Sequence, residues 1–218
     1  MMQMPDIHKK TTGRPVDHQK TQRVFDAIDD ILANEGISGL SIERIAKNAG
    51  ISKATLYRRF GDIQGVLGAY VETFTQNAFD QALQSKSVNL KSPLDLEPVL
   101  INIGIALMTL ISQPRVVAFD NAMLASGPRF IEFKEALYRN GPQKAVSQIS
   151  ELLEQAGISS PLFDITTLGD ILFHIWRSGF YDRVRITGQI EMDSQQLESH
   201  IASGTRFFLS NILAEEYQ

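Results

Sequence analysis

Apolar residues recur at the spacing of α-helices along most of the chain. In the segment 20–35, positions i, i+3, i+4 and i+7 form one stripe, made of Val24, Phe25, Ile28, Ile31 and Leu32. Gly36 follows this segment directly, and glycine is the usual residue just past a helix end. The same periodicity predicts helices over 63–83, 95–112, 115–125, 129–140, 143–156, 162–184 and 194–215.

The placement of proline agrees with these helices. The chain has eight prolines, none between positions 16 and 92 or between 162 and 218. Proline disrupts helix interiors but is tolerated at the first helical position, so each proline is expected to mark the start of a helix or the residue before it. No alternating apolar pattern longer than four residues indicates a strand, and no Asn-Gly or Asp-Gly pair between two such patterns indicates a hairpin. The sequence therefore predicts an all-α fold of about nine helices.

The residues from 41 to 60 have the pattern of a helix-turn-helix. Ser41 is a suitable N-cap for a short first helix. The inner face of that helix consists of Ile42, Ile45 and Ala49. Ala46 is small enough for a second helix to cross closely, and Gly50 can adopt the positive φ that the turn requires.

The second helix of this pattern is expected to expose a basic, hydroxyl-bearing side. Ser52 caps its start, and Leu56 and Phe60, four residues apart, hold it against the core. Its other positions carry two hydroxyl groups and three cations, on Lys53, Thr55, Tyr57, Arg58 and Arg59. Such a helix fits the major groove of B-DNA, ~12 Å wide, where these groups reach base edges and phosphates. The alternative, a helical hairpin with a solvated basic side, is disfavoured because caps, crossing residue and turn glycine occur together.

Charge is distributed as expected for an N-terminal unit that binds a polyanion. The net charge of the chain is −4. Residues 1–60 carry 10 Lys+Arg and 7 Asp+Glu, a balance of +3, whereas residues 61–218 carry 11 and 18, a balance of −7. A mildly basic unit on an acidic body is the pattern of a protein whose first part alone touches DNA.

The order of a first helix, the 41–60 motif and a further helix resembles the TetR/AcrR transcriptional regulators over about residues 18–75. The resemblance implies a DNA-binding head on a helical body, a homodimer on a palindromic double-stranded DNA operator, and repression that ends when a small-molecule effector binds. It implies DNA-binding roles, through caps, phosphates or bases, for Ser41, Arg44, Ser52, Lys53, Ala54, Thr55, Tyr57, Arg58 and Arg59. The domains expected are an arm (1–15), the DNA-binding domain (16–62) and a ligand-binding and dimerisation domain (63–218).

One departure from the family concerns the start of the fourth helix. The family has lysine and then glutamate after the motif phenylalanine, whereas this chain has Ile63 and Gln64. The lysine–phosphate contact is therefore expected to be missing, and Arg59 or the arm residues Lys9, Lys10 and Arg14 are candidates to replace its charge. The departure keeps one alternative open, a helical small-molecule-binding protein whose DNA-binding head is vestigial.

A weaker resemblance covers the body, where residues 118–142 are similar to the C-terminal domains of AefR-like members. A ligand pocket needs apolar walls and a few polar groups. The candidate lining residues are Phe74, Met108, Phe119, Met123, Phe173, His174, Trp176 and Arg177. The last helix has an apolar arc wider than one core contact needs, which predicts a dimer interface formed by Leu197, Ile201, Phe208 and Ile212.

Other functional classes receive little support from the sequence. The absence of cysteine excludes disulfides, thiolate metal sites and thiol nucleophiles, and the four histidines have no metal-ligand spacing. Asp29, Asp30 and Asn34 weakly resemble a diphosphate–magnesium motif, but no second acidic cluster accompanies them. We expect neither an enzyme nor a cofactor. No apolar run reaches the ~18–20 residues of a membrane span, so a cytoplasmic protein without a membrane partner is expected.

Overall fold

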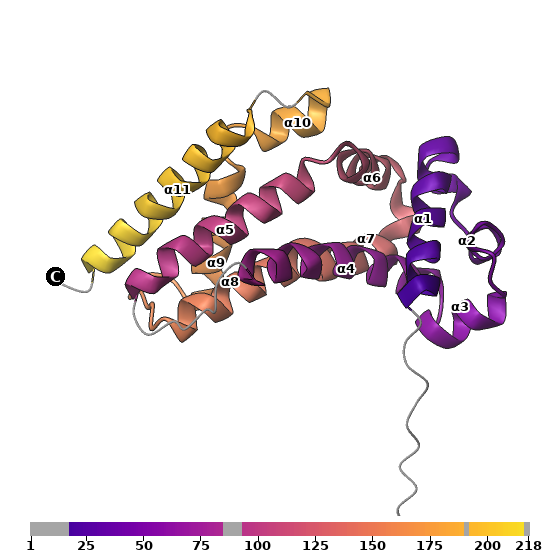
Figure 1. Ribbon diagram of the computed structural model, residues 1–218, viewed down its shortest axis with the longest axis horizontal. Helices are drawn as coiled ribbons and strands as arrows, with labels where there is room; N and C mark the ends of the chain where they lie inside the picture. Colours follow the sequence, from indigo (N-terminus) through magenta and orange to yellow (C-terminus); the bar gives the residue numbers. More distant parts are fainter. Residues whose placement is uncertain (1–17, 85–92, 190–191, 216–218) are drawn as a thin grey trace, which may run out of the picture.

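The computed structural model describes residues 18–84, 93–189 and 192–215, and within these ranges it contains helices and no strand (Figure 1). The all-α prediction is confirmed. The helices are α1 (His18–Glu35), α2 (Ile42–Ala49), α3 (Lys53–Phe60), α4 (Ile63–Gln84), α5 (Pro93–Ile111), α6 (Pro114–Ala125), α7 (Ile131–Tyr138), α8 (Lys144–Gln155), α9 (Ile165–Arg177), α10 (Tyr181–Thr187) and α11 (Ser194–Glu215).

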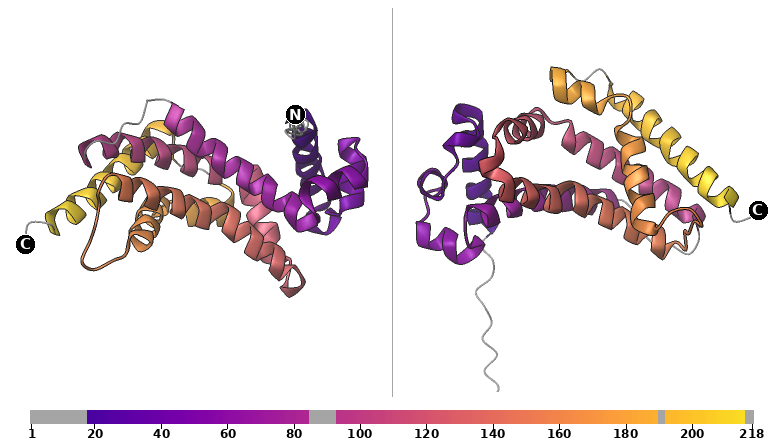
Figure 2. Two further views of the ribbon diagram at one scale, coloured as in Figure 1. Left: turned by 90° about the horizontal axis from the view of Figure 1, so that it is seen from below. Right: turned by 180° about the vertical axis from the view of Figure 1, so that it is seen from behind.

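Helices α1, α2 and α3 form a head at one end of the molecule, and the remaining helices form the body (Figures 1 and 2). α4 starts beneath the head and runs along the body, where it packs against α5 and α7. α6 contacts α1, so both α4 and α6 join the body to the head. At the far end, α11 packs on α5 and α9, and α8 packs on α9.

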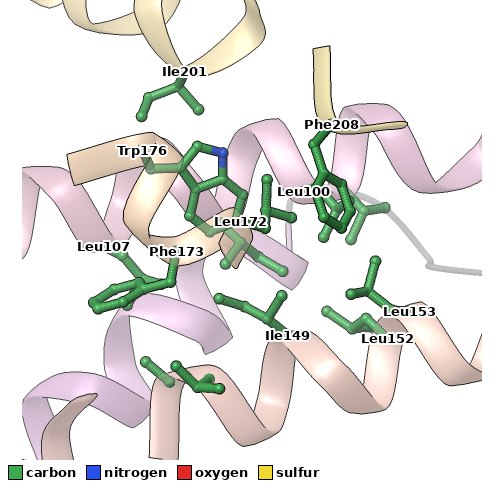
Figure 3. Close-up of a cluster of buried hydrophobic side chains, with 14 of the residues drawn as sticks. Leu100, Leu107, Ile149, Leu152, Leu153, Leu172, Phe173, Trp176, Ile201 and Phe208 are labelled. Carbon is green, nitrogen blue, oxygen red and sulfur yellow. The ribbon is translucent and has the colours of Figure 1, made fainter. Parts of the chain in front are cut away.

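The body is held together by a large apolar cluster centred on α5, α8, α9 and α11 (Figure 3). Trp176 is completely buried there, and Figure 3 shows its ring between Ile201 and Leu172. The indole Nε1 donates a hydrogen bond of 2.9 Å to Thr205 Oγ1 on α11. Because burying an indole N–H without an acceptor is costly, this bond fixes how α9 and α11 cross.

The predicted dimer stripe on α11 lies inside this cluster, which corrects the prediction. Ile201, Phe208 and Ile212 are buried within the chain, and Leu197 packs partly buried against the same cluster. The wide apolar arc of α11 is needed to cover both α5 and α9 of the same chain. Ile201, Phe208 and Ile212 therefore stabilise the body and are not available to a second chain, whereas Leu197 remains partly exposed.

A second apolar cluster lies in the head and continues into the body. Val24 and Ile28 of α1 and Leu56 of α3 are completely buried in it. The body contributes side chains from α4, α6 and α7, namely Val66, Leu67, Tyr70, Phe119, Met123 and Phe133. The head is thus packed on the body through shared side chains and not through a linker.

The break expected at Pro142 is absent. Residues 139–143 form a π-helical turn, with Pro142 inside it, that connects α7 to α8 without interruption. Pro98 likewise lies inside α5, several residues after the helix begins at Pro93. A widened turn removes the clash between a proline ring and the preceding carbonyl, so helix 131–155 continues where the sequence predicted two helices.

The helix expected over 162–184 is divided. α9 begins at Ile165, where Asp164 caps it by accepting a hydrogen bond of 2.8 Å from the Thr167 N–H. It ends at Arg177, because Ser178 is extended with ψ 140° and Gly179 has φ 83°. The chain then restarts as α10 at Tyr181.

In the part of the chain that the structure describes, no single helix is long and apolar enough to cross a membrane. The pair α5 and α6 passes the same test of length and composition only when taken together, and it is bent by 65° at its junction.

Candidate functional site

The turn between α2 and α3 has the geometry that the sequence predicts. Ser41 Oγ accepts a hydrogen bond of 3.3 Å from the Arg44 N–H and caps α2. Gly50 adopts the left-handed conformation, with φ 64° and ψ 37°, which other residues adopt at a cost. Ser52 Oγ then accepts a bond of 3.2 Å from the Thr55 N–H and caps α3. The inner positions Ile42, Ile45, Ala46, Ala49 and Leu56 are buried.

The outer side of α3 presents polar and basic groups to solvent. Tyr57 is 50% exposed, although it is a large aromatic residue in a folded domain. Arg58 and Ala54 are also exposed. These three residues project from a short helix that is capped at its start and packed on the core by Leu56, so their positions are fixed by the fold.

Other predicted DNA-binding side chains have partners within the head. Lys53 Nζ lies 3.1 Å from Glu43 Oε1 of α2, and both side chains are more than half exposed. Glu43 has a lowered pKa, first because of a backbone hydrogen bond and then because of Lys53. Thr55 Oγ1 lies 2.9 Å from Ser52 Oγ, and Arg44 forms an ion pair with Glu35.

Arg59 differs from the sequence expectation. It was expected on the exposed side of α3, but it is only partly exposed and its Nη2 donates a hydrogen bond to Thr21 Oγ1 of α1. Its guanidinium also lies 5.5 Å from the centre of the Phe60 ring. Arg59 therefore braces α3 against α1.

Ile63 and Gln64, which replace the family's usual lysine and glutamate at the start of α4, both contact other parts of the chain. Asp62 Oδ1 accepts a hydrogen bond of 2.8 Å from the Gly65 N–H, as expected of an N-cap. Ile63 packs against the head cluster, and Gln64 Nε2 donates a bond of 2.6 Å to Glu132 Oε2 of α7. Both side chains thus connect the helix to the protein itself. The arm residues Lys9, Lys10 and Arg14 lie outside the described residues.

The body contains a cavity of about 130 Å³ lined by residues of α4 to α10. Its wall includes the three predicted residues Phe74, Phe119 and Phe173. The wall also contains Tyr70, Asp120 and Tyr181, which the sequence pattern does not single out. The cavity is thus lined by five aromatic side chains and one carboxylate, together with smaller aliphatic residues.

The other predicted pocket residues lie elsewhere. Met108 and Trp176 are completely buried in the body cluster, and Met123 belongs to the head cluster. His174 is exposed on α9. Arg177 stacks on the Tyr181 ring at 4.4 Å from its centre, so it lies next to the cavity without lining it.

Asp120 is a polar wall residue for which the sequence pattern gives no signal. It lies in the cavity wall, where burial raises its pKa and the charges of Arg185 and Arg177 partly oppose that shift. Among the residues described, none forms a hydrogen bond or ion pair with its carboxylate.

A chain of contacts links the cavity to the head. Tyr70, a wall residue, donates a hydrogen bond from its hydroxyl to Asp29 Oδ1 of α1. Arg115 Nη1 of α6 lies 3.5 Å from Asp29 Oδ2, and its guanidinium lies 4.4 Å from the centre of the Phe74 ring. Burial, and then the bond to Asp29, raises the pKa of Tyr70. Asp29 therefore connects the head to the body, because it contacts both Tyr70 of α4 and Arg115 of α6.

In the described ranges, no group of three or more His, Asp or Glu side chains is placed to hold a metal ion.

Two family models match the chain. Residues 24–70 match bacterial regulatory proteins of the tetR family, and residues 98–159 match the C-terminal domain of AefR-like transcriptional repressors. The two segments together make up half of the chain, and they cover the helix-turn-helix, the joint residue Tyr70 and most of the cavity wall from α5 to α8. No curated protein matches the chain in sequence.

Solved structures of the same family share the fold. A TetR transcriptional regulator from Agrobacterium tumefaciens has 19% identity and a TM-score of 0.65, over 89% of this chain and 98% of the other. The flavonoid-responsive regulator FrrA has 21% identity and a TM-score of 0.63, over 89% and 97%. The fatty acid degradation regulator FadR from Bacillus halodurans has 14% identity and a TM-score of 0.58, over 88% and 96%. By its two matched domains and its fold, this chain belongs to the tetR family of bacterial transcriptional regulators and has an AefR-like C-terminal domain.

Proposed function

We propose that the protein is a transcriptional repressor that binds operator DNA through α3 and leaves it when a small molecule fills the body cavity. The observation that carries the DNA-binding part is the exposed side of α3, where Tyr57 and Arg58 project from a capped, core-anchored helix. The proposed division of the chain is an arm (1–15), a DNA-binding domain (16–62) and a ligand-binding body (63–218).

Each exposed group on α3 has a chemistry suited to DNA. Arg58 donates in a planar fork that matches guanine edges or phosphate oxygens, and the Tyr57 hydroxyl suits a phosphate. Ala54 presents a methyl group of the kind that contacts thymine. Ser41, Arg44, Ser52 and Thr55 bring hydroxyl, guanidinium and backbone N–H groups toward the DNA backbone. Lys53 would exchange Glu43 for a phosphate.

The DNA-binding proposal is tested on an operator selected from genomic fragments by the purified full chain. Arg58→Ala and Tyr57→Ala should each weaken binding by about tenfold or more, with circular dichroism and melting temperature unchanged. Binding should also fall steeply with salt, and the Arg58→Ala slope should be shallower by about one if Arg58 meets a phosphate. Arg183→Ala, the same charge change on α10, is the matched control. Unchanged affinity in both α3 variants would overturn the assignment.

The effector part of the proposal is supported by the contacts between the cavity and the head. A ligand in the cavity meets Tyr70, which contacts Asp29 directly, and Phe74, which contacts Asp29 through Arg115. A shift of α4 or α6 at the cavity therefore displaces α1. Release is measured by adding candidate effectors to the protein–operator complex; a ligand that binds the cavity and leaves operator affinity unchanged would contradict this part.

We further propose a homodimer, formed through the outer side of α11. Phe207 is 64% exposed on that helix, and Ser199, Ser203 and Ser210, which are also exposed, lie along the same side. Small residues beside one large apolar residue let a symmetry-related helix approach closely. Phe207→Glu should convert the dimer to monomers in sedimentation and weaken operator binding, whereas Glu198→Gln, an exposed position on another side of the same helix, should not. A wild-type monomer in sedimentation would exclude the dimer.

One observation favours a second candidate, a small-molecule-binding protein whose head has lost DNA binding. Gln64, at the position of the family's usual glutamate, is bonded to Glu132, and Ile63 is packed inside, so neither offers a charge to a phosphate. Failure of the genomic selection to enrich any fragment, combined with tight binding of a small molecule, would favour this candidate.

A further inference from the structure

The cavity wall is dominated by aromatic rings from four helices. Tyr70 and Phe74 come from α4, Phe119 from α6, Phe173 from α9 and Tyr181 from α10. The Tyr70 and Phe74 rings meet edge to face, with centres 4.8 Å apart, and Tyr70 and Phe119 are tilted at 5.8 Å. Rings packed in this way present both faces and edges to the cavity, which suits a flat aromatic ligand.

Two of the four polar side chains of the wall, Tyr70 and Thr75, are already engaged in hydrogen bonds. The Tyr70 hydroxyl donates to Asp29, and Thr75 Oγ1 donates a bond of 3.2 Å to the Val71 carbonyl. Two wall groups from α6 and α10 are not engaged in a hydrogen bond with any described residue, the Asp120 carboxylate and the Tyr181 hydroxyl. A carboxylate in an apolar wall is stabilised by a hydrogen-bond donor, so a ligand that fills this cavity gains most by offering one.

The charges around Asp120 restrict that donor to a neutral group. Arg177 and Arg185 lie close enough to Asp120 to lower its pKa, and neither guanidinium lines the cavity. A cationic ligand at Asp120 would meet the repulsion of both arginines. An anionic ligand would meet the carboxylate first, without reaching the arginines behind it.

The size of the cavity restricts the ligand further. An engineered apolar cavity of about 150 Å³ binds benzene, and this cavity of about 130 Å³ is similar in volume. It therefore accommodates one six-membered ring with a small substituent before the walls must move.

We propose that the effector site binds a neutral single-ring phenol, with the ring between Phe74, Phe119 and Phe173 and the hydroxyl donating to Asp120. The Tyr181 hydroxyl donates in turn to the phenol oxygen. This inference rests on the proposed function in one respect only, that the cavity is the effector site.

The test uses calorimetric titration of the full chain, without DNA, with four probes of similar size: phenol, toluene, benzylamine and benzoate. Phenol should bind about tenfold or more tightly than toluene, because a hydrogen bond to a charged acceptor adds a factor of this order. Asp120→Ala removes the acceptor without narrowing the cavity, so toluene should then bind at least as tightly as phenol. Tyr181→Phe should weaken phenol alone, and Asp80→Asn, on the outer side of α4, should change nothing.

Other results would overturn the proposal. Preference for benzylamine would show that the carboxylate selects a cation, and preference for benzoate would show that the arginines select an anion. Equal binding of phenol and toluene by wild type, or an unchanged preference for phenol in Asp120→Ala, would show that Asp120 does not recognise the ligand. Because no DNA is present, a negative titration leaves operator binding by α3 intact. Conversely, phenol that binds as expected but does not release DNA contradicts only the proposed coupling.

Discussion

The hydroxyl of Tyr70 donates a hydrogen bond to the carboxylate of Asp29, and this single contact joins the cavity wall to the first helix of the head. The ring of Tyr70 belongs to the cavity, whereas its oxygen belongs to the head–body joint. Arg115 completes the joint by pairing with the other Asp29 oxygen while its guanidinium covers Phe74. A ligand that displaces either ring therefore acts on the same aspartate.

The first prediction concerns this joint. Tyr70→Phe keeps the ring in the cavity wall but removes the bond to Asp29. We expect ligand binding to remain within about threefold of wild type, while the ligand's effect on operator affinity falls by about 1 kcal/mol, the lower end of typical allosteric coupling. Operator affinity is measured with and without saturating ligand. Tyr138→Phe, which alters an exposed tyrosine of α7, is the control, and full coupling in Tyr70→Phe would remove this bond from the signal.

The second prediction concerns the ion pair between Lys53 and Glu43. Glu43→Gln removes the partner that holds Lys53 Nζ at 3.1 Å and also removes a negative charge from the exposed side of the head. We expect operator affinity to rise by about two- to fivefold at low salt, and the gain to shrink at high salt as screening increases. Glu151→Gln on α8 is the control for net charge. Lower affinity in Glu43→Gln would show that Glu43 itself contacts the DNA.

The third prediction concerns pH. Burial raises the pKa of Asp120 in the folded state, so the folded chain binds the proton of this carboxyl more tightly than the unfolded chain does. Stability from this group is therefore complete below its unfolded pKa of about 3.9 and is lost as the pH rises through the folded pKa. Asp120→Asn should melt at the same temperature as wild type at the acidic end and at a higher temperature at neutral pH. Melting curves across that range check it, and an equal or lower melting temperature at neutral pH would contradict it.

The fourth prediction concerns the core of the body. Thr205→Val preserves the shape of the side chain but leaves the Trp176 Nε1–H without its acceptor. We expect the free energy of unfolding to fall by about 1–3 kcal/mol, the cost of an unsatisfied buried donor. Thr205→Ser retains the hydroxyl and should lose less. Chemical denaturation of the three proteins makes the comparison, and equal stability of Thr205→Val and wild type would mean that the indole finds another acceptor.

The head was the part of the fold most predictable from sequence, because its structure is local. Ser41, Gly50 and Ser52 act on residues two to four positions away, and their caps and turn have the predicted geometry. Arg59 was the exception. Its partner Thr21 is 38 residues distant, and nothing in the 41–60 pattern signals a bond to α1.

The body was less predictable because its contacts are distant in sequence. The apolar arc of α11 indicated that this side of the helix is buried, but it did not indicate which partner covers it. The partners are α5 and α9 of the same chain. The cavity combines residues from α4 to α10. Of its wall residues, only Phe74, Phe119 and Phe173 could be predicted from the sequence. Asp120 and the bond from Tyr70 to Asp29 depend on how helices cross, which periodicity does not specify.

The apolar cluster of the head extends into α4, α6 and α7, and this has a consequence for protein engineering. A chimera made by cutting after residue 62 would strand Val24 and Ile28 without Tyr70, Phe119 and Phe133, and would expose them to water. A chimera that joins this head to another ligand-binding domain must therefore also carry these three aromatic residues. The DNA-reading module is therefore not portable as a stretch of sequence, but only as a three-dimensional set of side chains.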